Sequence, residues 1–151
     1  MSKVSKASNR MSAEELQALG RNTIGEALGM EILEVTHGQV TGRMPVDART
    51  HQPYGLLHGG ASVVLAETLG SIGSHFIASP MGKAAVGIEV NTNHLRGVRD
   101  GWVHGHAKLH HEGGKLHVWH IDITDDKGRA ICTSRLTVML VPQATTKKTA
   151  S

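Results

Sequence analysis

One stretch of the sequence, from about Gly60 to Ala78, most constrains how this chain can fold. Its apolar side chains do not keep to one face, and together they surround most of a helix. They are Val63, Val64, Leu65, Ala66, Leu69, Ile72, Phe76 and Ile77. A helix that is apolar nearly all round has to be buried. The stretch therefore predicts a long central helix enclosed by the rest of the fold.

The segments on either side of this helix predict a short helix and several strands that could enclose it. Ser12 and Glu15 form a capping box that predicts a short helix through about Leu19. Residues 30–46 predict two strands joined at His37-Gly38. Four further stretches are strand-like, at about 84–94, 102–112, 115–125 and 129–141. This order predicts an α+β fold in which a curled, largely antiparallel sheet wraps one central helix.

Length and charge place the fold in one domain with polar ends. A chain of 151 residues is typical of a single domain. We expect the domain to span 11–142, with disordered tails at 1–10 and 143–151. Five of the 16 Lys and Arg residues lie in these tails, so 11 basic and 13 acidic residues remain in the domain, a net charge of −2. With only four aromatic residues as well, the composition argues against nucleic-acid binding.

Targeting signals and cysteines point to a cytoplasmic protein. The N-terminal "MSKVSKASNR" has no apolar core and does not resemble a secretory signal. The apolar stretches look too short and interrupted for the roughly 20 residues that a membrane span needs. Cys132 is the single cysteine, so no internal disulfide can form. It lies among apolar residues and is expected to be an inert core thiol.

A glutamate in the middle of the apolar helix is the first candidate for chemistry. Glu67 would be an ordinary solvated charge if it stood on an exposed stripe. Its helical neighbours are small instead of charged, and two carry hydroxyls: Gly60, Val63, Val64, Gly70, Ser71 and Ser74. Such a face suits close contact with a second helix, with the carboxylate embedded in it.

The residues that open the helix, His58-Gly59-Gly60, are the second candidate. The first amides of a helix have no intrahelical partner and stabilise an anion. The glycines either let a ligand approach this backbone or only make a tight entry turn. A carboxylate and an oxyanion site together suggest acyl transfer. Gly59 and Glu67 are eight residues apart, roughly 12 Å along a helix, so they would have to cooperate between two chains.

The string "HQPYGLLHGGASVVLAETLGS" and the order of elements resemble the hot-dog fold acyl-CoA thioesterases. Within that family, the chain is most similar to the branch that acts on aromatic acyl-CoA. That branch includes the Arthrobacter-type 4-hydroxybenzoyl-CoA thioesterases and the 1,4-dihydroxy-2-naphthoyl-CoA hydrolases of menaquinone biosynthesis. "MPVDARTHQPYGLLHGGASVVLAE", "NTNHLRGVRDG" and "KGRAICTSRLT" look most like the latter. The likeness runs from about Met11 to Val141.

This resemblance implies roles for five catalytic residues. Glu67 would be the nucleophile or the general base, and the Gly59 N–H would polarise the thioester carbonyl. Gln52 and His58 would line the thioester site and orient the carbonyl or a water. Ser71 would hold the attacking water. The resemblance also implies a homodimer, or a homotetramer built from two dimers, in which each site takes Glu67 and Ser71 from one subunit and Gln52 and Gly59 from the other.

The resemblance implies a binding surface for the CoA ester as well. His94 stands where the family contacts the acyl group and CoA. Arg96, Arg99 and Lys115 are cations placed for the phosphates, and Gly114 lies on a turn whose N–H groups suit phosphate. The related branch has Ser or Thr near this turn, whereas this chain has "GGKL".

The 11 histidines call for a metal check. His104 and His106 would share a strand face, and a Gly113-Gly114 hairpin would put His110 opposite His117. No Cys/His or HExxH spacing is present. We therefore expect no metal and no cofactor, since CoA is part of the substrate.

Two other functions remain open from the sequence. A hot-dog hydroxyacyl dehydratase would pair an acid with a general-base histidine, for which His58 is available. A non-catalytic acyl-CoA-binding protein would keep the pocket but would not require a carboxylate at position 67. Gln52 and Ser71 favour thioester hydrolysis over both.

Overall fold

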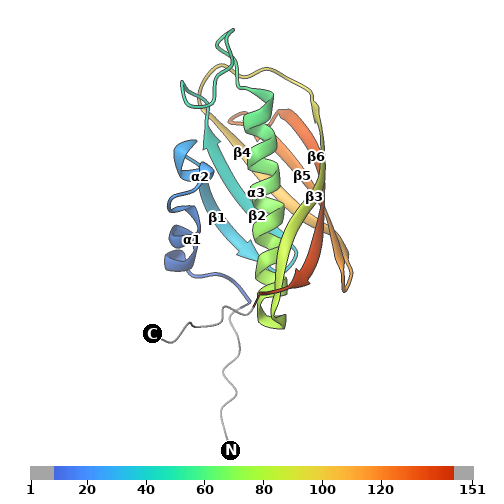
Figure 1. The fold of residues 1–151 in the computed structure, drawn as a ribbon. Coiled ribbons are helices and arrows are strands. Elements are labelled where there is room, and N and C mark those ends of the chain that lie inside the picture. The colour runs from blue at the N-terminus through green and yellow to red at the C-terminus, as the bar shows by residue number, and fades with distance from the viewer. Residues whose placement is uncertain (1–8, 145–151) are drawn as a thin grey trace, which may run out of the picture.

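The structure is a computed structural model that describes residues 9–144. A long helix, α3, crosses the concave side of one sheet, and two short helices, α1 and α2, lie beside its first strand (Figure 1). In chain order the elements are α1 (Ala13–Gly20), α2 (Ile24–Ala27), β1 (Glu31–Thr36), β2 (Gln39–Pro45), α3 (Gly59–Ala78), the 3-10 helix η1 (Ser79–Met81), β3 (Lys83–His94), β4 (Trp102–Glu112), β5 (Leu116–Asp125) and β6 (Ala130–Pro142). The sequence predicted all but α2 and η1.

All six strands belong to one antiparallel sheet with the order β1-β2-β4-β5-β6-β3. Hairpins join β1 to β2, β4 to β5 and β5 to β6. β3 follows the central helix and pairs with β6, so it becomes the edge opposite β1. The sheet curls around α3 (Figure 1), which confirms the predicted α+β architecture.

The contact between α3 and the sheet depends on small residues in the helix. Trp119 of β5 is fully buried, and its ring lies in the space where a side chain on Gly73 would be and in van der Waals contact with Gly70. A Cβ on Gly70 would come within 2.6 Å of the Leu136 side chain. These glycines let the helix backbone approach the sheet closely, although each glycine within a helix costs about 1 kcal/mol relative to alanine.

By length and composition alone, the 23 residues from Gly59 to Met81 would be long and apolar enough to cross a membrane. The expectation that no stretch reaches that length was therefore wrong. Ten residues of α3 are buried, and many of them pack in the core formed with the sheet. The helix thus behaves as the core helix of a globular domain, and its burial accounts for its composition.

The β4–β5 hairpin differs from the prediction. Glu112 pairs with His117, and a bulge follows Leu109, so His110 does not lie opposite His117. The connection is longer than the predicted two-residue turn, because residues 113–116 lie between the paired residues Glu112 and His117. The Gly113 N–H donates to the Leu116 carbonyl within it. His110 instead stacks on His120, with ring centroids 4.9 Å apart.

Parts of the two predicted tails lie within the described residues. Arg10 forms a β-bridge with Thr36, and the Gln143 N–H donates to the Gly82 carbonyl at 3.0 Å. Residues 1–8 and 145–151 lie outside the described part, so the tail boundaries stay a prediction.

A small polar network is buried between α3 and β5. Ser74 Oγ accepts a hydrogen bond from Trp119 Nε1 at 2.8 Å and lies 3.0 Å from His117 Nδ1. Ser74 and His117 are almost completely buried, and His117 Nε2 has no hydrogen-bond partner in the described part of the chain. Burial is the main reason that the pKa of His117 is lowered. The charge of Glu112 partly offsets this shift, and the charges of His111, His37 and Lys83 add to it. A proton on this ring would be an unpaired charge in the core.

We therefore expect the protein to lose stability in mild acid. In the unfolded chain the pKa of His117 has its ordinary value of about 6.5, so the folded protein keeps its full stability above that pH. Stability is lost as the pH falls from this value toward the lowered pKa of the folded state. Urea unfolding between about pH 7.5 and about pH 5 measures the slope of the unfolding free energy against pH. His117→Asn should flatten the slope and His120→Asn, at an exposed position, should not; equal slopes in wild type and His117→Asn would contradict the assignment.

Candidate active site

The start of α3 is built from two glycines, each covered by a histidine ring. A Cβ on Gly59 would lie 2.7 Å from His94 Nε2, and a Cβ on Gly60 would lie 2.9 Å from His58 Nδ1. Neither glycine has a positive φ. The two glycines therefore also leave room for the two imidazoles, a role that neither reading of the sequence, close approach of a ligand or a tight turn, had included.

The first turn of α3 leaves one amide open. Gly60 N–H donates to His58 Nδ1 at 2.8 Å, and the Ala61 and Ser62 amides donate to the His58 carbonyl at 3.0 and 3.4 Å. The Gly59 N–H has no partner within residues 9–144. The positive end of the helix is thus presented to a ligand mainly through this single donor.

Gly59 opens into a cavity of about 400 Å³ at this end of the molecule. Ten residues line it: Gln52, Leu56, Leu57, Gly59, Ser62, His94, Leu95, Arg96, Gly97 and Ile131. Gln52 Oε1 accepts a hydrogen bond from the Tyr54 N–H, which turns the side-chain NH₂ of Gln52 away from that contact. The cavity therefore combines an amide donor, a free backbone N–H, an imidazole and a guanidinium.

Glu67 lies in a different place, beside the open edge of the sheet. Its side chain is half-buried, and a Cβ on Gly87 would lie 2.7 Å from Glu67 Oε1. Gly87 belongs to β3, just before a bulge at Ile88. The carboxylate thus fits into a gap that a glycine leaves in an edge strand.

The helix face around Glu67 is only partly the one that the sequence predicted. Val63, Val64 and Ser71 are half-exposed, as expected for a surface available to a second helix. Gly70 and Ser74 are buried against the sheet, so their assignment to that surface was wrong. Because the sheet curls across the helix, the stripe that is open at Glu67 is covered by β5 at Ser74 (Figure 1).

One chain brings only some of the predicted site residues together. Gln52, Gly59, His94 and Arg96 line the same cavity, whereas Glu67 and Ser71 do not reach it. His58 is exposed and turned onto Gly60 instead of lining the cavity.

The predicted phosphate-binding residues are also divided. Arg99 lies next to the cavity, with Nη1 3.4 Å from the Tyr54 carbonyl. Gly114 and Lys115 lie at the opposite end of the sheet, where the Gly114 carbonyl accepts from Lys83 Nζ at 2.8 Å. Gly114 and Lys115 could contact the same ligand as Arg96 and Arg99 only if the two pairs came from different chains.

Two site residues were missed by the sequence analysis. Gly87 could have been found, because a glycine within a strand marks a bulge or a close approach. Ser62 places a buried hydroxyl against the cavity one turn after Gly59, and nothing in an apolar helix distinguishes it beforehand.

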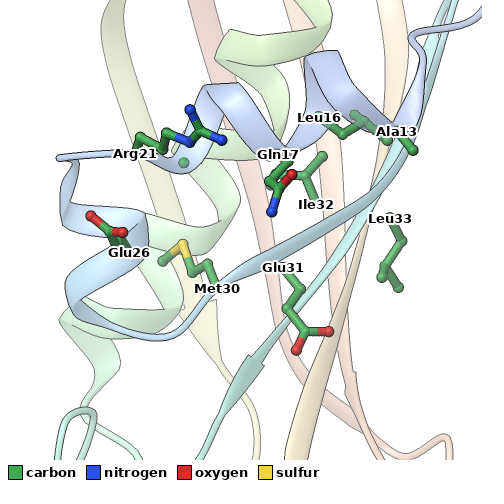
Figure 2. A pocket seen from close by; sticks show the side chains of 10 residues that line it. Ala13, Leu16, Gln17, Arg21, Glu26, Met30, Glu31, Ile32 and Leu33 are labelled. Carbon is green, nitrogen blue, oxygen red and sulfur yellow. The ribbon is translucent and has the colours of Figure 1, made fainter.

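A larger cavity of about 530 Å³ lies away from these residues, between α1, α2 and β1 (Figure 2). Its lining includes the apolar side chains of Ala13, Leu16, Met30, Ile32 and Leu33 and the charged side chains of Arg21, Glu26 and Glu31. It contains none of the predicted site residues. Among residues 9–144, no three His, Cys, Asp or Glu side chains come close enough together to hold a metal ion.

Known proteins agree with this geometry. The family model described as the thioesterase superfamily matches residues 54–132. The solved structure of a variant of thioesterase PA1618 from Pseudomonas aeruginosa superposes with a TM-score of 0.84, at 47% identity, covering 87% of this chain and 95% of that one.

Two curated relatives extend the comparison. The 1,4-dihydroxy-2-naphthoyl-CoA hydrolase of Escherichia coli is 42% identical over 132 residues, which cover 87% of this chain and 96% of that protein. The proofreading thioesterase EntH of Cronobacter turicensis is 43% identical over 131 residues, covering 87% and 95%. With the central helix, the wrapped antiparallel sheet and the matched family model, this chain belongs to the thioesterase superfamily and is a hot-dog thioesterase.

Proposed function

We propose that this thioesterase hydrolyses an aromatic acyl-CoA to the free acid and CoA, at a site completed by a second copy of the chain. The observation that carries the proposal is the separation of two groups on one helix. The open Gly59 N–H and the Glu67 carboxylate are eight residues apart, roughly 12 Å along α3. Both would have to lie about 3 Å from the same carbonyl to act on it.

The two edges of the sheet indicate where the second copy would bind. Along β1, Arg10 bridges to Thr36 and the Met11 N–H donates to the Val35 carbonyl, so part of that edge is occupied. Within the described residues β3 pairs on one side only, with β6, and it exposes Val86 and Ile88. An open edge with apolar side chains favours strand pairing with another chain. Antiparallel pairing of two β3 strands would bring Glu67 of each chain toward the other chain's helix start.

In such a dimer the reaction needs no group beyond the chain and water. The Gly59 N–H and the Gln52 NH₂ would hold the negative oxygen that develops on the thioester carbonyl. Glu67 of the other subunit would attack the carbonyl carbon or take a proton from a water held by Ser71. The C–S bond then breaks, and the CoA thiolate leaves as the thiol with a proton that comes from water. On the nucleophilic route water then cleaves the acyl–Glu67 anhydride and frees the carboxylate. On both routes water supplies the new oxygen of the free acid. No metal or cofactor enters these steps.

The aromatic acyl group rests on the resemblance and on the relatives. One relative is named a 1,4-dihydroxy-2-naphthoyl-CoA hydrolase and another a proofreading thioesterase, so the names do not agree on one substrate. His94 and Arg96 in the cavity, with Arg99 beside it, are available for the CoA ester. Gly114 and Lys115 would contribute from the partner. A dimer of dimers and a cytoplasmic location complete the proposal, the latter supported by the buried, unpaired Cys132.

The geometry favours hydrolysis over the other two functions. In a dehydratase His58 would be free to act as a base, whereas its Nδ1 here accepts from the Gly60 N–H. A non-catalytic acyl-CoA-binding protein would gain nothing from keeping a glycine at position 87 for the Glu67 carboxylate.

Glu67→Gln should keep the fold and CoA-ester binding but lower kcat by on the order of 10³-fold, because it removes the reacting carboxylate. Thiol release from an aryl-CoA measures kcat, and calorimetric titration with a non-hydrolysable CoA analogue measures binding. Glu14→Gln on the exposed face of α1 is the control. Turnover near the wild-type level would reject the mechanism, and a variant that does not fold would make Glu67 structural.

A mixed dimer of Gln52→Ala and Glu67→Ala chains should recover activity that neither parent has. If sites are shared, one site of the mixed dimer carries both lesions and the other carries none, so up to roughly half of the wild-type activity returns. Differently tagged chains, coexpressed and purified by both tags, provide the sample. Tagged dimers with the same lesion in both chains are the control, and mixed dimers as inactive as these would show that each site lies within one chain.

Aromatic esters should be the better substrates. We expect a higher kcat/KM for 1,4-dihydroxy-2-naphthoyl-CoA or hydroxybenzoyl-CoA than for palmitoyl-CoA. The same thiol assay over a panel of aryl, short-chain and long-chain esters tests this. A tenfold preference for long saturated chains would overturn the aromatic assignment while leaving thioester hydrolysis intact.

A further inference from the structure

The imidazole of His58 acts as the N-cap of α3. Its Nδ1 accepts the Gly60 N–H at 2.8 Å, and its carbonyl accepts the Ala61 N–H at 3.0 Å. The residue is exposed and is absent from the lining of the cavity next to it. Caps of this kind are usually supplied by Ser, Thr, Asp or Asn, so a ring in this position is an unusual choice.

The hydrogen bond fixes the state of the ring. An acceptor at Nδ1 needs its lone pair, so the neutral ring carries its proton on Nε2. A doubly protonated ring would lose the acceptor and would put a positive charge at the positive end of the helix. The observed cap therefore belongs to neutral His58.

The backbone around this ring is held at several points. His58 N–H donates to the Thr50 carbonyl and Leu57 N–H to the Val98 carbonyl, each at 2.7 Å. The ring itself lies where a side chain at Gly60 would be. With Gly60 N–H bonded to His58 Nδ1 and the next two amides directed at the His58 carbonyl, Gly59 N–H is left as the open donor of the first turn.

We propose that His58 is a positioning residue, which caps α3 with its neutral imidazole and so holds the Gly59 N–H ready for the oxyanion without touching the substrate. This inference rests on the proposed thioester hydrolysis, and it replaces the expectation that His58 orients the carbonyl or the water directly. Fixed donors are effective because they need no reorganisation when charge develops.

His58→Ala and His58→Asn separate positioning from direct contact. Alanine removes the cap and should lower kcat on an aryl-CoA by about tenfold to a hundredfold, with KM little changed. Asparagine accepts a first-turn amide through a shorter side chain and should recover most of that loss. If His58 touches the substrate or water through Nε2, asparagine should lose as much as alanine, and the proposal is wrong.

A second pair of variants tests the contact with Gly60. Gly60→Ala should lower kcat severalfold in the wild-type background, because its Cβ displaces the ring, and much less in the His58→Asn background, where the shorter side chain leaves room. Equal losses in both backgrounds would overturn the proposal.

Hydrogen exchange at the Gly60 amide gives a readout that does not depend on catalysis. It should be slow in wild type and His58→Asn and at least tenfold faster in His58→Ala; unchanged exchange in His58→Ala would contradict the cap. A wild-type protein that hydrolyses no acyl-CoA, yet shows this exchange pattern, would refute the proposed function while leaving the cap in place.

Discussion

The close docking of α3 onto β5 is the contact on which the rest of the structure depends. Trp119 enters the space left by Gly73 and packs against Gly70, and its Nε1 donates to Ser74 Oγ from the same helix. This contact sets the height of the helix above the sheet. His94 and Gly87, which meet the helix start and Glu67, both belong to β3 of the same sheet, so we expect their distance from the helix to depend on this contact as well. Core packing and site geometry thus come from one interface.

Much of this arrangement could be predicted from the sequence because its signals are local. The apolar run of α3, the capping box at Ser12 and the alternating strands gave the order of elements and most of their bounds. Glu67 stood out because a carboxylate within an apolar helix needs a reason. The glycines after His58 were recognised as a special helix start, and the rise of a helix alone was enough to predict a site shared between two chains.

What the sequence could not give depends on contacts between distant segments. A bulge in β4 and a longer hairpin moved His110 away from His117, because strand register depends on turn geometry that a glycine pair does not fix. The burial of Ser74 depends on the curl of the sheet over the helix. Gly59 and Gly60 leave room for the rings of His94 and His58, and the first of these rings comes from another element.

If Glu67 acts as proposed, Gly87 sets stability against activity. A glycine within a strand carries a large entropy cost on folding and offers no side chain to pack, so a β-branched residue at that position would make a better strand. Such a residue would also collide with the Glu67 carboxylate, whose Oε1 is 2.7 Å from the position of a Cβ. Selection for heat resistance alone would therefore tend to fill this gap and expel the carboxylate. An engineering programme that screens only for melting temperature should hold position 87 constant.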